Sequence, residues 1–322
     1  MPLRLEPASG AALTQILHDT YPVWGAGLAF DAYARYQAAE RRTAWGSAHI
    51  ERVALRDGTR VMASAKRYDL AARVDGRIRR VLGIGALFTP KELRGRGAAS
   101  AMMAHLVDAA NTEGLEFALL FSDIGPALYE RLDFVPVPLE TTTLRVRTKH
   151  GAPAMLVRAG DDRDLAHVTE ISLTRTAKAR FALDRTEDFI RHAISKRRLL
   201  AGLAPSGRRQ VEFLVAEEGH RAVAYMLCSV HNAQWTIEEA GDRDPTGARL
   251  GAMLQVMLAR EPSLEPPRIS GHWPHDLRPP QLEVASVRPS AAVMMIRPLR
   301  DRTLPMPPLS ASDVAFWHGD LF

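Results

Sequence analysis

The sequence has only one cysteine, Cys228, and no long apolar run, and each shortage excludes a class of protein. A single cysteine cannot form an intramolecular disulfide framework, so we expect a reducing, cytoplasmic location. The absence of a run of about 18 apolar residues argues against a membrane-spanning helix. The opening residues MPLRLEPASG lack the apolar core of a signal peptide. The net charge of +5 is spread along 322 residues, so neither a nucleic-acid interface nor a membrane partner is expected.

Several common site patterns are also missing. No Gly-Lys-Ser/Thr follows a glycine-rich turn, and the third glycine position of a dinucleotide-binding pattern is occupied by Ser100. No serine lies in a Gly-x-Ser-x-Gly turn, which leaves hydrolase chemistry without support. The HWPH stretch at 272–275 has two histidines but no cysteine partner nearby, so we expect no metal site.

The apolar periodicity predicts an alternation of helices and strands in the first half. Asp57-Gly58 is a strong signal for a hairpin turn between two strands. The expected helices cover residues 11–20, 29–44, 98–112 and 126–132, and the expected strands cover 51–57, 60–70, 74–88, 116–122 and 141–147.

A second series of similar elements follows an expected linker at 148–153. Helices are predicted over 186–200 and 247–260, with a run of strands between them. The order repeats that of the first half, although residue identity between the halves is poor. A chain of this length suits two domains, which we place at 1–147 and 154–322.

One turn of the chain combines glycines, which have no side chain, with positively charged arginines. Residues 89–100 read TPKELRGRGAAS, between a strand and a helix. The first turn of a helix has free amide groups and a partial positive charge, which together favour an anion such as phosphate. Gly95 and Gly97 remove side chains that would keep a diphosphate away, and Arg94 and Arg96 add charge. The alternative is an ordinary basic loop that enters a helix.

Two motifs at this spacing carry a family resemblance. VLGIGALFTPKELRGRGAASAMM (81–103) and YERLDFVP (129–136) resemble the GCN5-related N-acetyltransferase (GNAT) family, with Arg94, Gly97 and Ala99 at its glycine-motif positions. Asp133 stands where a glycine is usual, and aspartate tolerates a left-handed backbone better than most residues. The tandem arrangement resembles the enhanced-intracellular-survival type, whose third domain has no counterpart here. The resemblance implies an α+β GNAT fold, a mixed central sheet flanked by helices, in two copies with the second degenerate.

The resemblance also implies acetyl-CoA as co-substrate, with no metal. Its diphosphate would lie on the amides of the glycine turn, and its pantetheine arm would run along the preceding strand. Separated parallel strands there would leave unpaired backbone donors that can polarise an acyl carbonyl. The implied binding residues are Ala86, Leu87, Phe88, Arg94, Gly95, Arg96, Gly97, Ala98, Ala99 and Ser100.

The family assigns the general acid to a tyrosine that corresponds to Tyr129. In the tandem type a terminal carboxylate acts as base, which corresponds to Phe322. Trp24, Tyr33 and Tyr36 lie where the family's first helices cover the acceptor. Each of these aromatic residues has an alternative role in simple core packing.

The expected function is acetyl transfer from acetyl-CoA to a primary amine by direct attack, at one site in the first domain. Glu238, Glu239, Asp242 and Asp244 surround the corresponding turn of the second half, and these carboxylates would repel a diphosphate. The alternative function is a catalytically silent regulator that binds acyl-CoA. The amine, a small molecule or a lysine side chain, the general base and the oligomeric state stay open.

Overall fold

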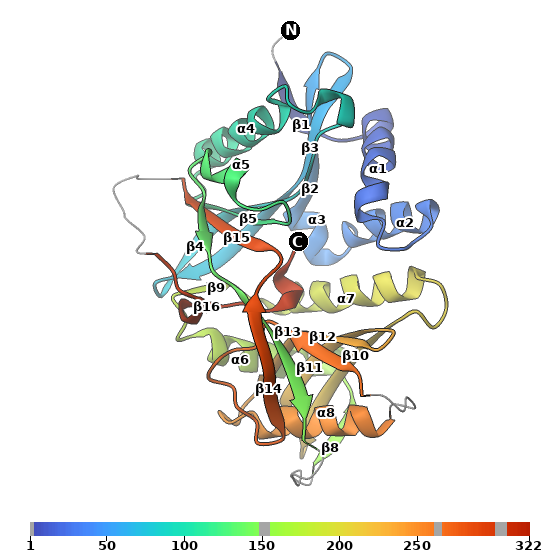
Figure 1. Ribbon diagram of the computed structural model, residues 1–322, viewed down its shortest axis with the longest axis vertical. Coiled ribbons are helices and arrows are strands. Elements are labelled where there is room, and N and C mark those ends of the chain that lie inside the picture. Colours follow the sequence, from blue (N-terminus) through green and yellow to red (C-terminus); the bar gives the residue numbers. More distant parts are fainter. Residues whose placement is uncertain (1–2, 148–154, 261–265, 300–307) are drawn as a thin grey trace. The chain divides into compact units, whose positions relative to one another are not determined.

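The computed structural model describes residues 3–147, 155–260, 266–299 and 308–322. The chain divides into two compact units (Figure 1). The first unit comprises Met1–Pro138, Ala291–Leu309 and Phe322, and the second comprises Leu139–Ser290 and Ser310–Leu321. The units therefore do not divide the chain at a single point, as the expected domains 1–147 and 154–322 would. The linker expected at 148–153 lies outside the described residues.

The first unit is built on a mixed sheet with the strand order β1-β2-β3-β4-β5-β15-β6. Only β4 and β5 are parallel, and all other neighbours along this order are antiparallel. The strands are β1 (Arg4–Pro7), β2 (Ile50–Asp57), β3 (Arg60–Val74), β4 (Arg77–Phe88), β5 (Phe117–Ser122), β15 (Val293–Pro298) and β6 (Val135–Val137).

Helices cover both faces of this sheet (Figure 1). They are α1 (Gly10–Trp24), α2 (Phe30–Glu40), α3 (Ala44–His49), α4 (Ala98–Glu113) and α5 (Ala127–Glu130). On one face, Met102 and Leu106 of α4 pack against strand residues such as Leu82. On the other, Ile16 of α1 packs against alternate positions of the same strands. Burial of these two helix faces forms the core of the unit.

The helix predicted over 29–44 is two helices in the structure. The first, α2, ends at Glu40, and Thr43 is the N-cap of α3, where its hydroxyl accepts a hydrogen bond from the Gly46 amide at 2.9 Å. A threonine in this position satisfies a free first-turn amide and favours a new helix start. The prediction missed the break because the apolar spacing continues across it.

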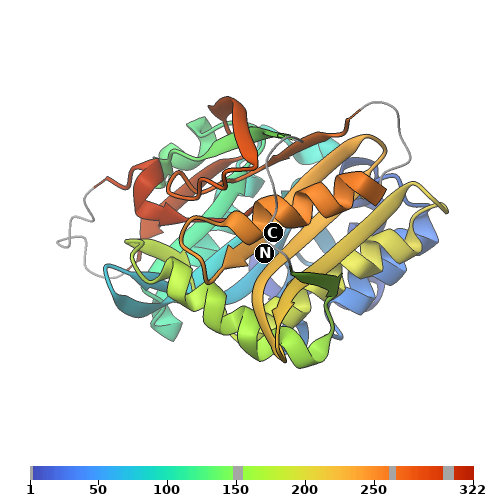
Figure 2. The same ribbon diagram turned by 90° about the horizontal axis from the view of Figure 1, so that it is seen from below.

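The second unit has a sheet with the strand order β14-β7-β13-β12-β11-β10-β8, in which only β12 and β13 are parallel. Figure 2 shows α8 lying over its strands. The strands are β8 (Leu156–Ala159), β10 (Arg209–Glu218), β11 (Arg221–His231), β12 (Gln234–Asp242), β13 (Arg268–Gly271), β7 (Glu140–Val146) and β14 (Leu282–Pro289), and the helices are α6 (Leu165–Thr176), α7 (Glu187–Leu203) and α8 (Ala248–Arg260). A further parallel pair joins β9 (Phe181–Leu183) to β16 (Val314–Ala315).

The two sheets have the same strand order, which confirms two copies of one fold. Counted from β1 and from β8, the fourth and fifth strands form the parallel pair in each unit. The sixth position holds β15, from late in the chain, in the first unit, and β7, from early in the chain, in the second. The strand predicted at 141–147 is present as β7 but belongs to the second sheet. Its alternating pattern predicts a strand and cannot say which of two similar sheets it joins.

Candidate functional site

The parallel strands β4 and β5 separate part-way along their length. Their pairing ends at Ile84 and Leu120, and β4 continues unpaired with β5 through Gly85 to Phe88. Ala86 has a φ of +47°, and the register between β3 and β4 shifts here, which marks a bulge. A left-handed alanine is uncommon and costs energy, so the bulge is maintained by its surroundings. Sequence reasoning placed Ala86–Phe88 beside the cofactor but did not predict the bulge.

The glycine turn enters α4 with its first amides uncovered. Gly97 is the N-cap with a φ of 78°, and no side chain caps the helix. Gly95 is also left-handed, and a Cβ at either glycine would meet no heavy atom within 4 Å. The main chain of the turn is thus accessible to a ligand, and the free amides with the helix dipole suit a diphosphate.

The two arginines of this turn are exposed. Arg94 Nε donates a hydrogen bond to the Thr89 carbonyl at 3.2 Å, and the Arg94 guanidinium lies 5.9 Å from the Phe88 ring centroid. These contacts keep Arg94 near the end of β4. Both arginines can therefore add charge to an anion on the α4 amides.

Tyr129 lies on α5 and is 7% exposed. Among the described residues no hydrogen-bond partner is found for its hydroxyl, and the ring packs edge-on to Phe134 at 6.2 Å. Burial, together with the carboxylate of Asp123, raises the pKa of Tyr129 above its usual value. The hydroxyl therefore keeps its proton at neutral pH, as a general acid must. The neighbouring Asp133 has a φ of 61°, the left-handed conformation for which glycine is usual.

Phe322 lies against the unpaired part of β4. A methyl group at Gly85 would meet its main-chain carbonyl carbon and oxygen at 3.1 Å. Its ring centroid is 4.6 Å from that of Tyr68 and 5.1 Å from that of Phe121. The main chain of Phe322 is therefore placed where β4 and β5 separate.

The three acceptor candidates have different surroundings. Trp24, at the end of α1, lies edge-on to Phe88 with ring centroids 6.1 Å apart. Tyr36 on α2 is half-buried. Tyr33 is 1% exposed, and its hydroxyl and that of Thr20 are 3.0 Å apart. This burial favours the alternative role of core packing for Tyr33, whereas Trp24 is positioned beside the cofactor strand.

The corresponding turn of the second unit is closed by its own carboxylates. Asp242, 7% exposed, accepts a hydrogen bond from the Arg249 amide in the first turn of α8 at 3.0 Å. Its other oxygen accepts from the Asp244 amide at 2.8 Å and from Arg249 Nη1 at 3.1 Å. A side-chain anion thus occupies the helix terminus that is open in α4.

The space where β12 and β13 separate is also occupied, in this case by the chain near Gly319. Their pairing ends at Ile237 and Gly271, and a Cβ at Gly319 would meet the Glu238 carbonyl oxygen at 2.9 Å. Arg185 pairs with Glu239 at 2.7 Å and with Asp320. Sequence reasoning missed this buried ion triad, because Arg185 lies in an unremarkable polar stretch.

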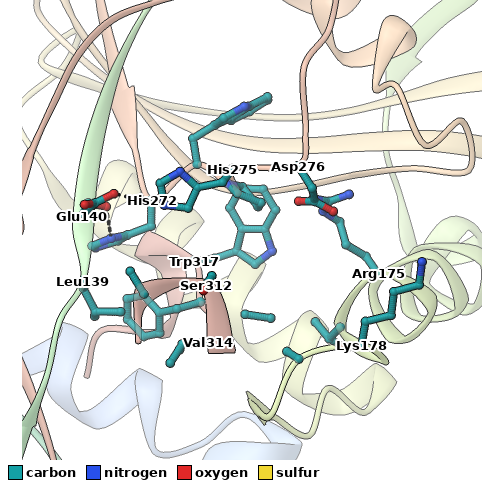
Figure 3. A pocket seen from close by; sticks show the side chains of 17 residues that line it. Leu139, Glu140, Arg175, Lys178, His272, His275, Asp276, Ser312, Val314 and Trp317 are labelled. Atoms are coloured by element: carbon teal, nitrogen blue, oxygen red, sulfur yellow. Dashed lines mark hydrogen bonds and ion pairs between the residues drawn. The ribbon is translucent and has the colours of Figure 1, made fainter. Parts of the chain in front are cut away.

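A separate pocket of about 220 Å³ lies within the second unit (Figure 3). His272 Nδ1 donates to the Glu140 main-chain carbonyl at 2.8 Å, and His275 Nε2 is 3.1 Å from the Glu140 carboxylate. Arg175 pairs with Asp276 at 2.6 Å. Burial, with a contribution from His318, lowers the pKa of His272 to about 4, so its ring is neutral. Throughout the described ranges, no group of three or more His, Cys, Asp or Glu side chains is placed to hold a metal ion.

Comparison with known protein families identifies the family that this region of the chain matches. Residues 22–137 match the acetyltransferase (GNAT) domain family. These residues form a GNAT domain. The match covers β4, the glycine turn, α4 and Tyr129, so the expected motifs lie within it. Comparison with curated proteins gave no match.

Solved structures extend the likeness in fold to the whole chain. A GCN5-related N-acetyltransferase from Anabaena variabilis has a TM-score of 0.70 at 11% identity, over 93% of this chain and 73% of that one. One from Kribbella flavida has a TM-score of 0.68 at 17% identity, over 92% and 70%. Eis1 from Mycobacterium abscessus has a TM-score of 0.57 at 14% identity, over 92% and 74%. The chain thus has the tandem GNAT fold, as predicted, with two similar sheets.

In the part of the chain that is described, no helix combines the length and apolar character needed to cross a bilayer.

Proposed function

We propose that the first unit transfers the acetyl group of acetyl-CoA to a primary amine. The amine nitrogen attacks the thioester carbonyl carbon directly, and no covalent intermediate forms on the protein. The observation that carries this proposal is the separation of β4 from β5 after Ile84, followed at once by the uncovered glycine turn. One strand end and one helix start thus offer backbone groups to both the acyl and the diphosphate ends of one ligand.

The cofactor contacts follow from this order of elements. Arg94, Gly95, Arg96, Gly97, Ala98, Ala99 and Ser100 would hold the diphosphate. The main chain of Ala86, Leu87 and Phe88, which does not pair with β5, would pair with the pantetheine arm, whose amides need such partners. The same strand end would polarise the acyl carbonyl as negative charge develops on its oxygen.

Two groups would handle the protons. A carboxylate at Phe322 would take one proton from the attacking ammonium, and Tyr129 would donate one to the leaving sulfur. The nitrogen loses its second proton to solvent as the thiolate leaves, the carboxylate passes its proton to solvent, and the tyrosinate regains one proton from solvent, so the sum is acetylated amine, free coenzyme A and one released proton. The raised pKa of Tyr129 and the approach of the Phe322 main chain to Gly85 support these roles.

The acceptor would be a small amine or a lysine side chain, with Trp24 and Tyr36 among its contacts. Trp24 supports this because it lies edge-on to Phe88, one of the proposed cofactor-binding residues at the end of β4. Neither nucleic acid nor a membrane has a role in this proposal, and the cytoplasm, where acetyl-CoA is made and used, is the expected compartment.

The second unit would bind no acetyl-CoA. The Asp242 carboxylate accepts from the Arg249 amide in the first turn of α8 and from the Asp244 amide in the turn before it, where a diphosphate would need free donors. Coenzyme A would also have to displace the contact of Gly319 with Glu238, which fills the strand separation. We therefore expect one active site in each chain.

Calorimetry with coenzyme A and assay of thiol release with a panel of amines test the proposal together. Binding of one coenzyme A per chain, with thiol release that depends on an amine, supports the acetyltransferase. Binding without turnover across the panel would instead favour the silent acyl-CoA-binding regulator. A chain that does not bind coenzyme A at all contradicts both.

A further inference from the structure

A second cavity lies within the first unit, between α1, α2 and the strands β2 and β3. Its volume is about 320 Å³, in the range of small-molecule sites. Its lining combines five apolar side chains with four cationic side chains and one amide. The apolar residues are Leu13, Leu17, Ala34, Ala38 and Ile50, and the polar residues are Gln37, Arg41, Arg42, Arg52 and Lys66.

Arg52 is the unusual member of this lining. It is 3% exposed, and its Nη2 donates to the Gln37 side-chain oxygen at 3.0 Å. Its Nη1 is fully buried and makes no hydrogen bond of regular geometry among the described residues, with the Tyr33 side chain as a neighbour. A buried charged donor without a partner is costly, so such a group marks a place that a ligand can complete.

The charge balance of the cavity points to an anion. Lys66, 8% exposed, is paired with Glu40, which is 2% exposed. Burial lowers the pKa of Arg52, and the nearby Tyr33, Tyr68 and Glu40 counter this effect only in part. Two buried cations thus share one buried carboxylate, and Arg41 and Arg42 add further positive charge at the exposed edge. A cavity with an excess of one buried positive charge is stabilised by a single negative charge.

We propose that this cavity binds a monocarboxylate with a short aliphatic chain. The carboxylate would lie beside the Arg52 guanidinium and near Lys66, in a charge-assisted contact of the kind that guanidinium groups make with planar anions. The aliphatic chain would lie along Leu13, Leu17 and Ile50, away from water. A monoanion neutralises the excess charge of the buried groups.

The site is independent of acetyl transfer, but it has one connection to that region. Lys66 and Tyr68 are two residues apart on β3 and so face the same side of the sheet. The Tyr68 ring contacts Phe322. A ligand at Lys66 would thus lie close to Tyr68, which is the next residue on that side of β3 and contacts Phe322.

Isothermal titration calorimetry of the full chain with butanoate, hexanoate and octanoate tests the proposal, with hexanamide and hexylamine as probes of the same length. We expect hexanoate to bind with a dissociation constant below about 1 mM, and at least tenfold more tightly than hexanamide or hexylamine. Equal affinity for hexanoate and hexanamide would show that no cation recognises the ligand. Failure of all three carboxylates to bind below about 10 mM would also overturn the site.

Two variants locate the ligand. Arg52→Met removes the guanidinium and leaves the Lys66–Glu40 pair, so the buried carboxylate keeps its partner. It should fold and lose the tenfold preference for hexanoate. Ala38→Trp keeps Arg52 but fills the cavity, and it should weaken hexanoate at least tenfold. Arg56→Met on the same strand, where the arginine pairs with Glu6 outside the cavity, is the matched control and should bind as wild type. Unchanged hexanoate binding in both cavity variants would place the ligand elsewhere.

Discussion

The aromatic ring of Phe322 packs on that of Tyr68, with the two ring centroids 4.6 Å apart. Tyr68 lies on β3, and its ring also approaches Gly85 on β4, where an added methyl group would be 3.2 Å from Tyr68 Cε2. The Phe322 main chain reaches the same glycine. Gly85 therefore has no space for a side chain, and the proposed base depends on this close approach.

Removal of Phe322 should lower kcat at least tenfold at neutral pH while coenzyme A binding persists, because the proposed base is lost. Without a base, kcat/KM should rise with pH toward the pKa of the amine, and added acetate should restore part of the rate. Phe322→Leu is the matched control, because it removes the aromatic ring and keeps the main-chain carboxylate. Gly85→Ala, which pushes on the Phe322 main chain, should show an intermediate loss. A deletion variant with the wild-type rate and pH profile would remove Phe322 from the mechanism.

Tyr129→Phe should reduce kcat by about an order of magnitude or more, because the leaving sulfur no longer receives a proton from the protein. The dissociation constant of coenzyme A should change little, since the ring and its packing on Phe134 are retained. Steady-state kinetics and calorimetry on the same preparation measure the two effects. Tyr21→Phe, which also deletes one phenol but breaks a bond to the Leu28 carbonyl, is the control and should keep its rate. If both variants turn over equally, Tyr129 serves only in packing.

The local features of the candidate site could be predicted from the sequence. Gly95 and Gly97 were expected to precede a helix at 98–112, and α4 covers Ala98–Glu113 with both glycines in the left-handed region. Such features follow from a few neighbouring residues, because only glycine adopts this conformation without strain. The short helix that carries Tyr129 was predicted for the same reason, with Pro126 at its start.

Features that depend on distant residues could not be predicted. β7 joins the second sheet and β15 joins the first, and the sequence of neither strand shows this. An alternating apolar pattern specifies which face of a strand is buried, but it does not specify which strand is the neighbour. The bulge at Ala86 was missed because alanine carries no signal for a positive φ. Lys66 ends a run of small and apolar residues in VMASAKRYDL, and its charge at that position was the available signal for the buried polar cluster. Arg52 follows Glu51 in ERVALRD, so its burial has no such signal.

Gly97→Ala should weaken coenzyme A at least tenfold and destabilise the protein by only about 1 kcal/mol, the usual cost of a left-handed alanine. The added methyl group meets no protein atom within 4 Å, so its effect on a ligand exceeds its effect on the fold. Calorimetry gives the affinity, and urea denaturation gives the free energy of unfolding. Gly114→Ala, at the C-terminal end of the same helix and also left-handed, should have the same stability cost with unchanged affinity. Equal affinity in the two variants would place the diphosphate away from the α4 terminus.

The neutral, buried His272 should make the second unit less stable in mild acid. Its pKa in the folded protein is about 4, below the ordinary value of 6.5, so the unfolded chain takes up this proton first as the pH falls. The stability that the neutral ring contributes is complete above about pH 6.5 and is lost as the pH falls toward 4, and the loss amounts to about 2 kcal/mol at pH 5. His272→Asn, whose amide can still donate to the Glu140 carbonyl, should reduce the loss of stability between pH 7 and pH 5 by about that amount. Urea denaturation at the two pH values measures it. His231→Asn, at an exposed strand end, is the control, and the same pH dependence in both variants would show that His272 is not the group responsible.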